Sequence, residues 1–329
     1  MIFNIKPVNH HIPDFTNKSF AVRYSELDFG GKTLVDSVEI LESLNRNKKE
    51  NDSLVEFSDL VGLSGAKFQL KYGSLIRKRN KTARQTKRQA RNVWKKFGFS
   101  NESVLKSLSL KLPLRVDWRD NKAISRVKRQ SLCGSCFALS VIETIESMVA
   151  IKTGTLKELS VQQVLDCNEY GMNCKGGDSC LILDWLLTSQ TDVQSNSDYP
   201  RLEDMSQEQS CRTDLEPSGL KVKDYSCDDF NHREELLLLY LAHQGPLIAS
   251  VDALPLKFYK FGTIQHNCDG KTEKLNHAVQ IVGYDMTGEV PFYIVKNSWG
   301  EKFGNEGFMN IAIGRNICGI AQSVAAVVV

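Results

Sequence analysis

The stretch QSLCGSCFALSVIETIESMVAIKTG, residues 130–154, joins two closely spaced cysteines to a run with helical periodicity. Gly154 follows the run as a stop signal, so the pattern predicts a helix that begins at Cys136. The backbone N–H groups and the positive dipole end at a helix N-terminus stabilise an anion, which favours a thiolate. Cys136 is therefore placed to act as a nucleophile. The apolar residues of the predicted stripe are Val141, Ile142, Ile145, Met148 and Val149.

The C-x-x-C pair of Cys133 and Cys136 is by itself also typical of redox sites and of half a zinc site. Zinc would need a second closely spaced pair, and a thioredoxin-like site would need a βαβ context. We find neither pattern, yet a redox or metal protein stays an alternative in which both thiols titrate or bind zinc. The remaining cysteines are Cys167, Cys174, Cys180, Cys211, Cys227, Cys268 and Cys318.

A thiolate nucleophile needs a base and a third group that orients the base. His277 begins one β-rich run and Asn297 follows the next, so antiparallel pairing of the runs would bring both side chains to one end of a sheet. The combination of Cys136, His277 and Asn297 favours a catalytic role over ordinary core positions. The short β-rich runs after about residue 220 are 247–251, 278–284, 292–296, 308–313 and 324–329.

Six segments together resemble the papain family of cysteine peptidases and span residues 112–329 in the family's order. The resemblance implies an α+β fold with a helical subdomain at 112–220, a β-barrel subdomain at 221–329 and a cleft between them. Residues 1–111 would be a helical, inhibitory propeptide. The segments are LPLRVDWRD (112–120), QSLCGSCFALS (130–140), LSVQQVLDCNEYGMNCKGG (159–177), NHAVQIVGY (276–284), NSWG (297–300) and CGIAQSV (318–324).

The resemblance implies a catalytic role for four residues: Cys136 as nucleophile, His277 as its proton partner, Asn297 as the group that orients the imidazole, and Gln130 as an oxyanion donor. The Gln130 amide and the Cys136 backbone N–H suit the preorganised donors that an oxyanion hole needs. Trp299 would shield the bond between His277 and Asn297 from water. No metal or organic cofactor is expected.

The substrate-binding residues follow from the same resemblance. Gly176 and Gly177 would pair with an extended substrate strand, which can approach only where a Cβ is missing. Family members generally prefer an apolar residue in the neighbouring pocket, but the acidic Asp178 indicates basic or polar residues here. A second departure is Phe137, where the family usually has tryptophan. The expected pocket residues are Asp178, Ser179, Leu275, Ala278 and Ser323.

All nine cysteines lie between Cys133 and Cys318. An odd number in one region indicates up to four disulfides and one thiol, and therefore an oxidising compartment. The family resemblance implies the pairs Cys133–Cys174, Cys167–Cys211 and Cys268–Cys318. Cys180 and Cys227 are left over beside Cys136 and are the candidates for a fourth bridge.

The net charge of +3 divides into a basic region, residues 1–112, and an acidic remainder. The basic run 77–96 is best interpreted as a linker that contacts the acidic part, with nucleic-acid binding ranked lower.

Three-residue spacing predicts amphipathic helices around residues 38–44 and 54–60. We expect propeptide docking at Phe57 and Phe68 and cleavage near Leu112-Pro113. Four N-x-S/T sites mark expected glycosylation: Asn17, Asn51, Asn80 and Asn101.

These features predict a cysteine endopeptidase that is made as a zymogen and works through a thioester. The alternative is a catalytically weak homologue that binds or regulates. Expected partners are protein or peptide substrates, the propeptide and inhibitors of the cystatin type, without nucleic acid or membrane, and the chain is expected to be a monomer. No signal peptide is visible in residues 1–15. The cysteines nevertheless favour the lysosome or the extracellular space.

Overall fold

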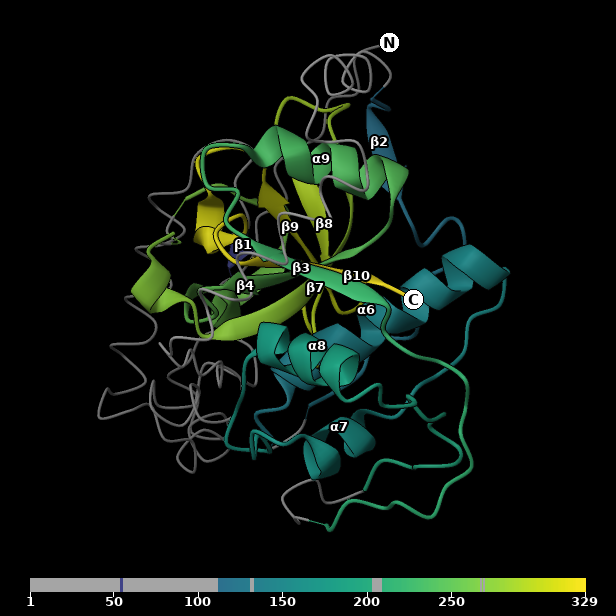
Figure 1. Cartoon of the computed structure of the whole chain (residues 1–329). Helices are drawn as coiled ribbons and strands as arrows, with labels where there is room; N and C mark the ends of the chain where they lie inside the picture. The colour runs from purple at the N-terminus through teal and green to yellow at the C-terminus, as the bar shows by residue number, and fades with distance from the viewer. Residues whose placement is uncertain (1–53, 56–111, 131–132, 203–208, 267, 269) are drawn as a thin grey trace, which may run out of the picture.

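Three helices, α6, α7 and α8, lie on one side of a large sheet, and α9 lies on the other (Figure 1). The computed structural model describes residues 54–55, 112–130, 133–202, 209–266, 268 and 270–329. The helices are α6 (Cys136–Thr153), α7 (Val161–Cys167), α8 (Ser179–Thr188) and α9 (Glu234–His243), with short 3₁₀ turns η1 (Pro255–Phe258), η2 (Thr272–Lys274) and η3 (Ile317–Gly319).

Helix α6 begins at Cys136 and ends at Thr153, with Gly154 as its C-cap, as predicted. Gly154 adopts φ 74°, a left-handed conformation that glycine adopts without steric cost, and its N–H donates to Ala150 O at 2.8 Å. The side chain of Ser160 caps α7 by accepting from Gln163 N. Local capping therefore fixes the C-terminal end of α6 and the start of α7.

Eight strands form one mixed sheet in the order β3-β10-β4-β7-β8-β9-β6, with β2 paired to β7. All pairings are antiparallel except that of β6 with β9. The strands are β2 (Arg115–Asp117), β3 (Asp224–Asp228), β4 (Leu247–Val251), β6 (Thr263–Ile264), β7 (His277–Asp285), β8 (Phe292–Lys296), β9 (Phe308–Ala312) and β10 (Val324–Val328).

Strands β7 and β8 pair antiparallel, with Gln280 opposite Lys296. Since His277 begins β7 and Asn297 follows β8, the two residues lie at the same end of the sheet. The antiparallel arrangement predicted for this pair is confirmed.

The helical prediction is wrong at Leu54 and Val55, which form strand β1 and pair antiparallel with β5 (Tyr259–Phe261). Backbone pairing with β5 replaces the helical turn that the three-residue spacing favoured. The other residues of the predicted N-terminal helices, the basic run, the glycosylation sites, Phe57 and Phe68 lie outside the described residues. The propeptide boundary stays a prediction.

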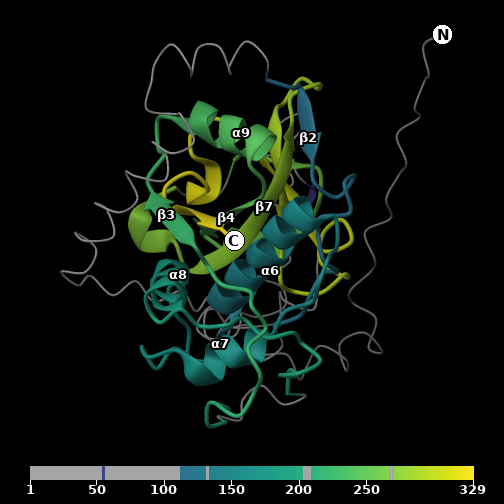
Figure 2. The same ribbon diagram turned by 45° about the vertical axis from the view of Figure 1, so that its right-hand side comes forward.

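The separation into a helical half and a β half is incomplete. Strand β2 lies in the first half but joins the sheet, and α9 lies in the second half (Figure 2). Two further contacts extend the attachment of β2: Met286 N donates to Leu114 O at 2.8 Å, and Tyr284 Oη donates to Pro113 O at 2.8 Å. The chain is thus anchored to the sheet from Pro113 onward.

The apolar core has two parts, one on each side of the sheet. The first contains Leu237, Leu241, Ile281, Tyr293 and Met309, and the second contains Phe137, Ile142, Ile145, Leu183 and Trp185. Within the described residues, we find no helix of the length and apolarity that crossing a membrane would require.

Candidate active site

His277 and Asn297 form a buried hydrogen-bonded pair. The distance from His277 Nε2 to Asn297 Oδ1 is 2.8 Å, and both side chains are excluded from solvent. Asn297 Oδ1 also accepts from Ser298 N at 2.8 Å. Because this oxygen accepts from both neighbours, Nε2 carries the imidazole hydrogen and Nδ1 carries the lone pair in the neutral ring.

The surroundings of His277 favour the neutral imidazole. Burial lowers the pKa of His277 to about 4, and the hydrogen bond with Asn297 partly opposes this effect. Nδ1 has no hydrogen-bond partner among the residues that the structure describes. The ring can therefore take up a proton at Nδ1.

Trp299, which the resemblance implies as a shield, packs against the imidazole. The ring centroids of Trp299 and His277 are 5.0 Å apart with an interplanar angle of 31°. Phe303 packs edge-on against the indole, with ring centroids 4.8 Å apart. These rings exclude water and strengthen the hydrogen bond between His277 and Asn297.

Gln130 is held beside the same pair through Ser298, a residue that the sequence analysis missed. Ser298 Oγ donates to Gln130 Oε1 at 2.7 Å, and Gln130 N donates to Ser298 O at 2.9 Å. The side-chain oxygen is thus fixed toward Ser298, and Nε2 points to Cys133 O at 3.4 Å, near the start of α6. The sequence held a hint, because Ser298 directly follows Asn297.

The packing of α6 on β7 places Cys136 and His277 at corresponding ends of their elements. Gln280 Nε2 donates to Glu143 O at 3.1 Å. From this contact, Cys136 lies seven residues back along the helix and His277 three back along the strand, about 10 Å in each case. Figure 2 shows α6 running alongside β7.

Cys136 is buried and is the one cysteine of nine that takes part in no disulfide, all nine being within the described residues. Three of the four bridges are those that the resemblance implied, namely Cys133–Cys174, Cys167–Cys211 and Cys268–Cys318. The two cysteines left over form the fourth, Cys180–Cys227. Because Cys133 is bridged to Cys174, the alternative in which Cys133 and Cys136 share a zinc ion or a redox cycle is wrong.

Gly176 and Gly177 connect Cys174 to helix α8. Gly176 adopts φ 107°, which favours glycine. At Gly177, a Cβ would lie 2.6 Å from Phe137 Cε2, so the aromatic side chain next to Cys136 occupies that space. The glycine is required by this internal contact, which is a reason separate from the approach of a substrate strand.

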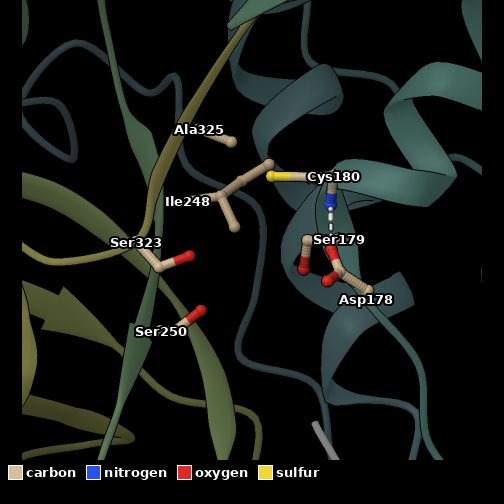
Figure 3. Close-up of a pocket in the computed structure, with 7 residues that line it drawn as sticks. All are labelled: Asp178, Ser179, Cys180, Ile248, Ser250, Ser323 and Ala325. Atoms are coloured by element: carbon tan, nitrogen blue, oxygen red, sulfur yellow. Dashed lines mark hydrogen bonds between the residues drawn. The ribbon is translucent and has the colours of Figure 1, made fainter. Parts of the chain in front are cut away.

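A small hollow separates the start of α8 from strands β4 and β10 (Figure 3). Three of the five expected pocket residues line it: Asp178, Ser179 and Ser323. Sequence reasoning missed four others, namely Cys180, Ile248, Ser250 and Ala325. The alternation of side chains along the predicted strands could have indicated Ile248 and Ser250 as neighbours on one face.

The structure does not place Leu275 and Ala278 in the hollow. Leu275 is buried against Gly319, where a Cβ would come within 2.3 Å of Leu275 Cδ2. Ala278 lies opposite Ser250 but on β7, which is covered by α6. Asp178 has a structural task as well, because its Oδ1 accepts from Cys180 N at 2.8 Å and caps α8.

A buried cysteine at a helix N-terminus, with a His–Asn pair on the adjoining sheet, defines the class of thiol peptidases. The family described as papain family cysteine protease matches residues 112–328, so the chain belongs to that family. The α+β papain-like fold and the assignment as a cysteine-type peptidase are thereby confirmed.

The quoted segments resemble cathepsin O in particular, and comparison with known proteins confirms this. Human cathepsin O is 40% identical over 232 residues, covering 70% of this chain and 71% of its own length. Mouse cathepsin O is 42% identical over 222 residues, covering 67% of this chain and 70% of its own length.

Solved structures show the same fold. Bromelain from Ananas comosus in complex with the E64 inhibitor is 33% identical with a TM-score of 0.58, covering 66% of this chain and 99% of its own. Stem bromelain precursor is 25% identical with a TM-score of 0.70, and the match covers 94% of this chain and 97% of the precursor. Procathepsin L2 from Tenebrio molitor larval midgut supports the fold alone. It is 24% identical with a TM-score of 0.77, and the match covers 94% of this chain and 98% of the procathepsin.

Proposed function

We propose that this chain is an endopeptidase that cleaves peptide bonds through a thioester on Cys136. The observation that carries the proposal is the buried 2.8 Å hydrogen bond between His277 Nε2 and Asn297 Oδ1, which leaves Nδ1 as the proton acceptor. With Cys136 at the corresponding end of α6, the chain supplies a nucleophile, a base and an orienting amide.

In the first half of the reaction, Nδ1 of His277 takes the proton from the Cys136 thiol, and Sγ attacks the carbonyl carbon. Gln130 Nε2 and the Cys136 backbone N–H donate to the oxyanion. His277 then gives its proton to the amine nitrogen, the C–N bond breaks and the amine product leaves. The acyl group remains on Cys136 as a thioester.

In the second half, Nδ1 takes a proton from water while the oxygen attacks the thioester carbon. The C–S bond breaks, the acid product leaves, and the proton returns to Cys136. Gly176 would pair with the extended substrate backbone, and the hollow beside α8 would receive one substrate side chain. The substrates are proteins or peptides, and the reaction needs no metal or organic cofactor.

The test compares the activated chain with Cys136→Ser and Cys136→Ala variants. We expect both substitutions to abolish hydrolysis of a peptide library and to abolish labelling by a thiol-alkylating epoxide, located by mass spectrometry. Retained turnover in Cys136→Ala, or labelling at a residue other than Cys136, would contradict the mechanism. Labelling of Cys136 without turnover of any peptide would favour the alternative, a weak homologue that binds or regulates.

Residues 1–111 are proposed to be an inhibitory propeptide that is removed by cleavage near Leu112-Pro113. The alignment of stem bromelain precursor with 94% of the chain supports this division. A basic N-terminal region beside an acidic remainder would add electrostatic attraction, which salt screens. Raising the ionic strength at fixed pH should speed propeptide release. An unchanged rate would leave hydrophobic docking as the main contact.

The four disulfides support an oxidising compartment, so we propose the lysosome or the extracellular space as its location. We propose a monomeric enzyme that is open to inhibitors of the cystatin type. Sedimentation of the activated chain with and without such an inhibitor tests both points, with a single 1:1 complex as the expected result.

A further inference from the structure

We propose that the Cys180–Cys227 disulfide closes the inner end of the hollow beside α8 and thereby limits the size of the substrate side chain that enters it. The inference rests on the proposed peptidase function. It assigns a specificity-determining role to a bridge that the mechanism does not use.

Two rows of residues from the sheet form the floor of the hollow. Ser250 and Ile248 lie two residues apart on β4, so their side chains share one face. Ser323 and Ala325 are spaced in the same way, and Ala325 lies opposite Ile248. The floor therefore has an outer polar row of two serines and an inner apolar row, separated by roughly 6.6 Å, one strand repeat.

The outer row is the one nearer to the catalytic pair. On β4, Val251 lies opposite His277, and Ser250 lies opposite Ala278. Ile248 lies opposite Gln280, further along the strand and away from the imidazole. A side chain that enters from the catalytic end therefore passes the serines first and reaches Ile248 and Ala325 last.

The disulfide stands at the far end of this path. Cys180, in the first turn of α8, lines the hollow, and its sulfur points toward Ile248 (Figure 3). Its partner Cys227 lies on β3 directly opposite Ala325. The bridge thus crosses from the helix to the sheet beside the inner row, and the space beyond Ala325 is closed covalently.

The chemistry of the lining indicates which side chain fits. Ile248, Ala325 and the disulfide favour a branched aliphatic end, while the serine hydroxyls line the entry. Asp178 is engaged in capping α8, through Cys180 N at 2.8 Å and Leu181 N at 3.4 Å. We therefore expect valine and leucine to be accepted ahead of phenylalanine and arginine, whose longer side chains meet the bridge.

The experiment measures kcat/KM for peptides in which each residue before the scissile bond is varied in turn among valine, leucine, phenylalanine and arginine. In the full chain after activation, the double variant Cys180→Ala/Cys227→Ala should raise the ratio of phenylalanine to valine turnover about tenfold, the discrimination that a few buried atoms provide. The matched control Cys167→Ala/Cys211→Ala removes a bridge from another part of the chain and should leave the ratio unchanged.

A second variant covers the case in which loss of the bridge unfolds the chain. Ala325→Leu keeps the disulfide but fills the inner end, and it should shift the preference from leucine toward valine. An unchanged ratio in both variants, with Cys136 still labelled by the epoxide, would overturn the inference and leave the peptidase function intact. A preference for arginine that Asp178→Asn removes would also overturn it. Absence of any Cys136-dependent cleavage would overturn both proposals.

Discussion

Lys296 Nζ lies 3.1 Å from Glu143 Oε1, and both side chains are almost fully withdrawn from solvent. Lys296 directly precedes Asn297, and Glu143 lies two helical turns beyond Cys136. Burial lowers the pKa of Lys296, and the carboxylate of Glu143 opposes this effect. One ion pair thus joins the strand that leads to Asn297 to the helix that carries Cys136.

The ion pair belongs to a larger buried cluster. Lys296 Nζ donates to Ser125 Oγ at 3.1 Å, and Ser125 Oγ donates to Glu146 Oε2 at 2.5 Å. Lys128 Nζ donates to both oxygens of Glu146, at 2.7 and 2.8 Å. Since the segment 125–128 leads into Gln130, the cluster connects the three segments that hold Cys136, Asn297 and Gln130.

Replacement of Lys296 by methionine should destabilise the chain by about 3–5 kcal/mol, because Glu143 would be left buried without its partner. The double variant Lys296→Met/Glu143→Met removes both charges and should recover most of that loss. Urea unfolding in a Cys136→Ser background, which prevents self-digestion, measures both values. If the double variant were no more stable than Lys296→Met alone, the loss of stability would not come from leaving Glu143 without its partner.

Asn297→Ala should lower kcat/KM by roughly 10²-fold without abolishing activity, since a positioned general base contributes about 10²–10⁴-fold and only its orientation is lost. Alanine at the exposed Asn305 is the matched control and should leave kcat/KM unchanged. The assay is peptide hydrolysis across a pH series. Full retention of activity, or unfolding of the variant, would argue against an orienting role.

Acid should destabilise the full chain through His277, whose pKa of about 4 lies below the ordinary 6.5. As pH falls from 6.5 toward 4, the unfolded chain binds a proton that the buried imidazole does not. The free energy of unfolding therefore falls by about 3 kcal/mol from its value above pH 6.5 as the pH passes through this window. Urea unfolding of Cys136→Ser at pH 7, 5.5 and 4 measures the loss. Adding His277→Gln should reduce it, and an equal loss in both proteins would refute the assignment.

Gly177→Ala should destabilise the chain by about 1–3 kcal/mol, because its Cβ would meet the ring of Phe137 at 2.6 Å. Phe137→Leu in the same chain should restore part of the stability by vacating the space. Thermal unfolding of the single and double variants checks the coupling. The matched control is Gly288→Ala, where nothing lies within 4 Å of the added Cβ. Strictly additive effects at Phe137 and Gly177 would mean that the two do not compete for space.

Local patterns were sufficient to predict α6, because a single stripe and Gly154 define both ends. They also predicted five strands closely (β4, β7, β8, β9 and β10), since β-branched runs between turn residues carry that information. The short strands were missed: β2 and β1 have too few residues to show alternation, and only pairing with β7 and β5 makes them strands.

The proposed catalytic side chains could be named from the sequence because each stands in a recognisable segment of the family. The supporting contacts were not, because they join residues far apart in sequence. Nothing in the sequence links Lys296 to Glu143. Nothing in it shows that the Ser298 hydroxyl donates to Gln130 Oε1 either. The contact of Leu275 with the distant Gly319 is another that the sequence does not reveal.

The pairing of β2 with β7 has a consequence for trimming by exopeptidases. An aminopeptidase needs a free, extended end, and the chain is hydrogen-bonded to the sheet from Pro113 through Asp117. Whichever protease makes the first cut upstream, later trimming should stop where this pairing begins. If the proposed removal of residues 1–111 takes place, a ragged set of cuts would converge on one N-terminus, set by the sheet and not by the selectivity of the protease that cuts.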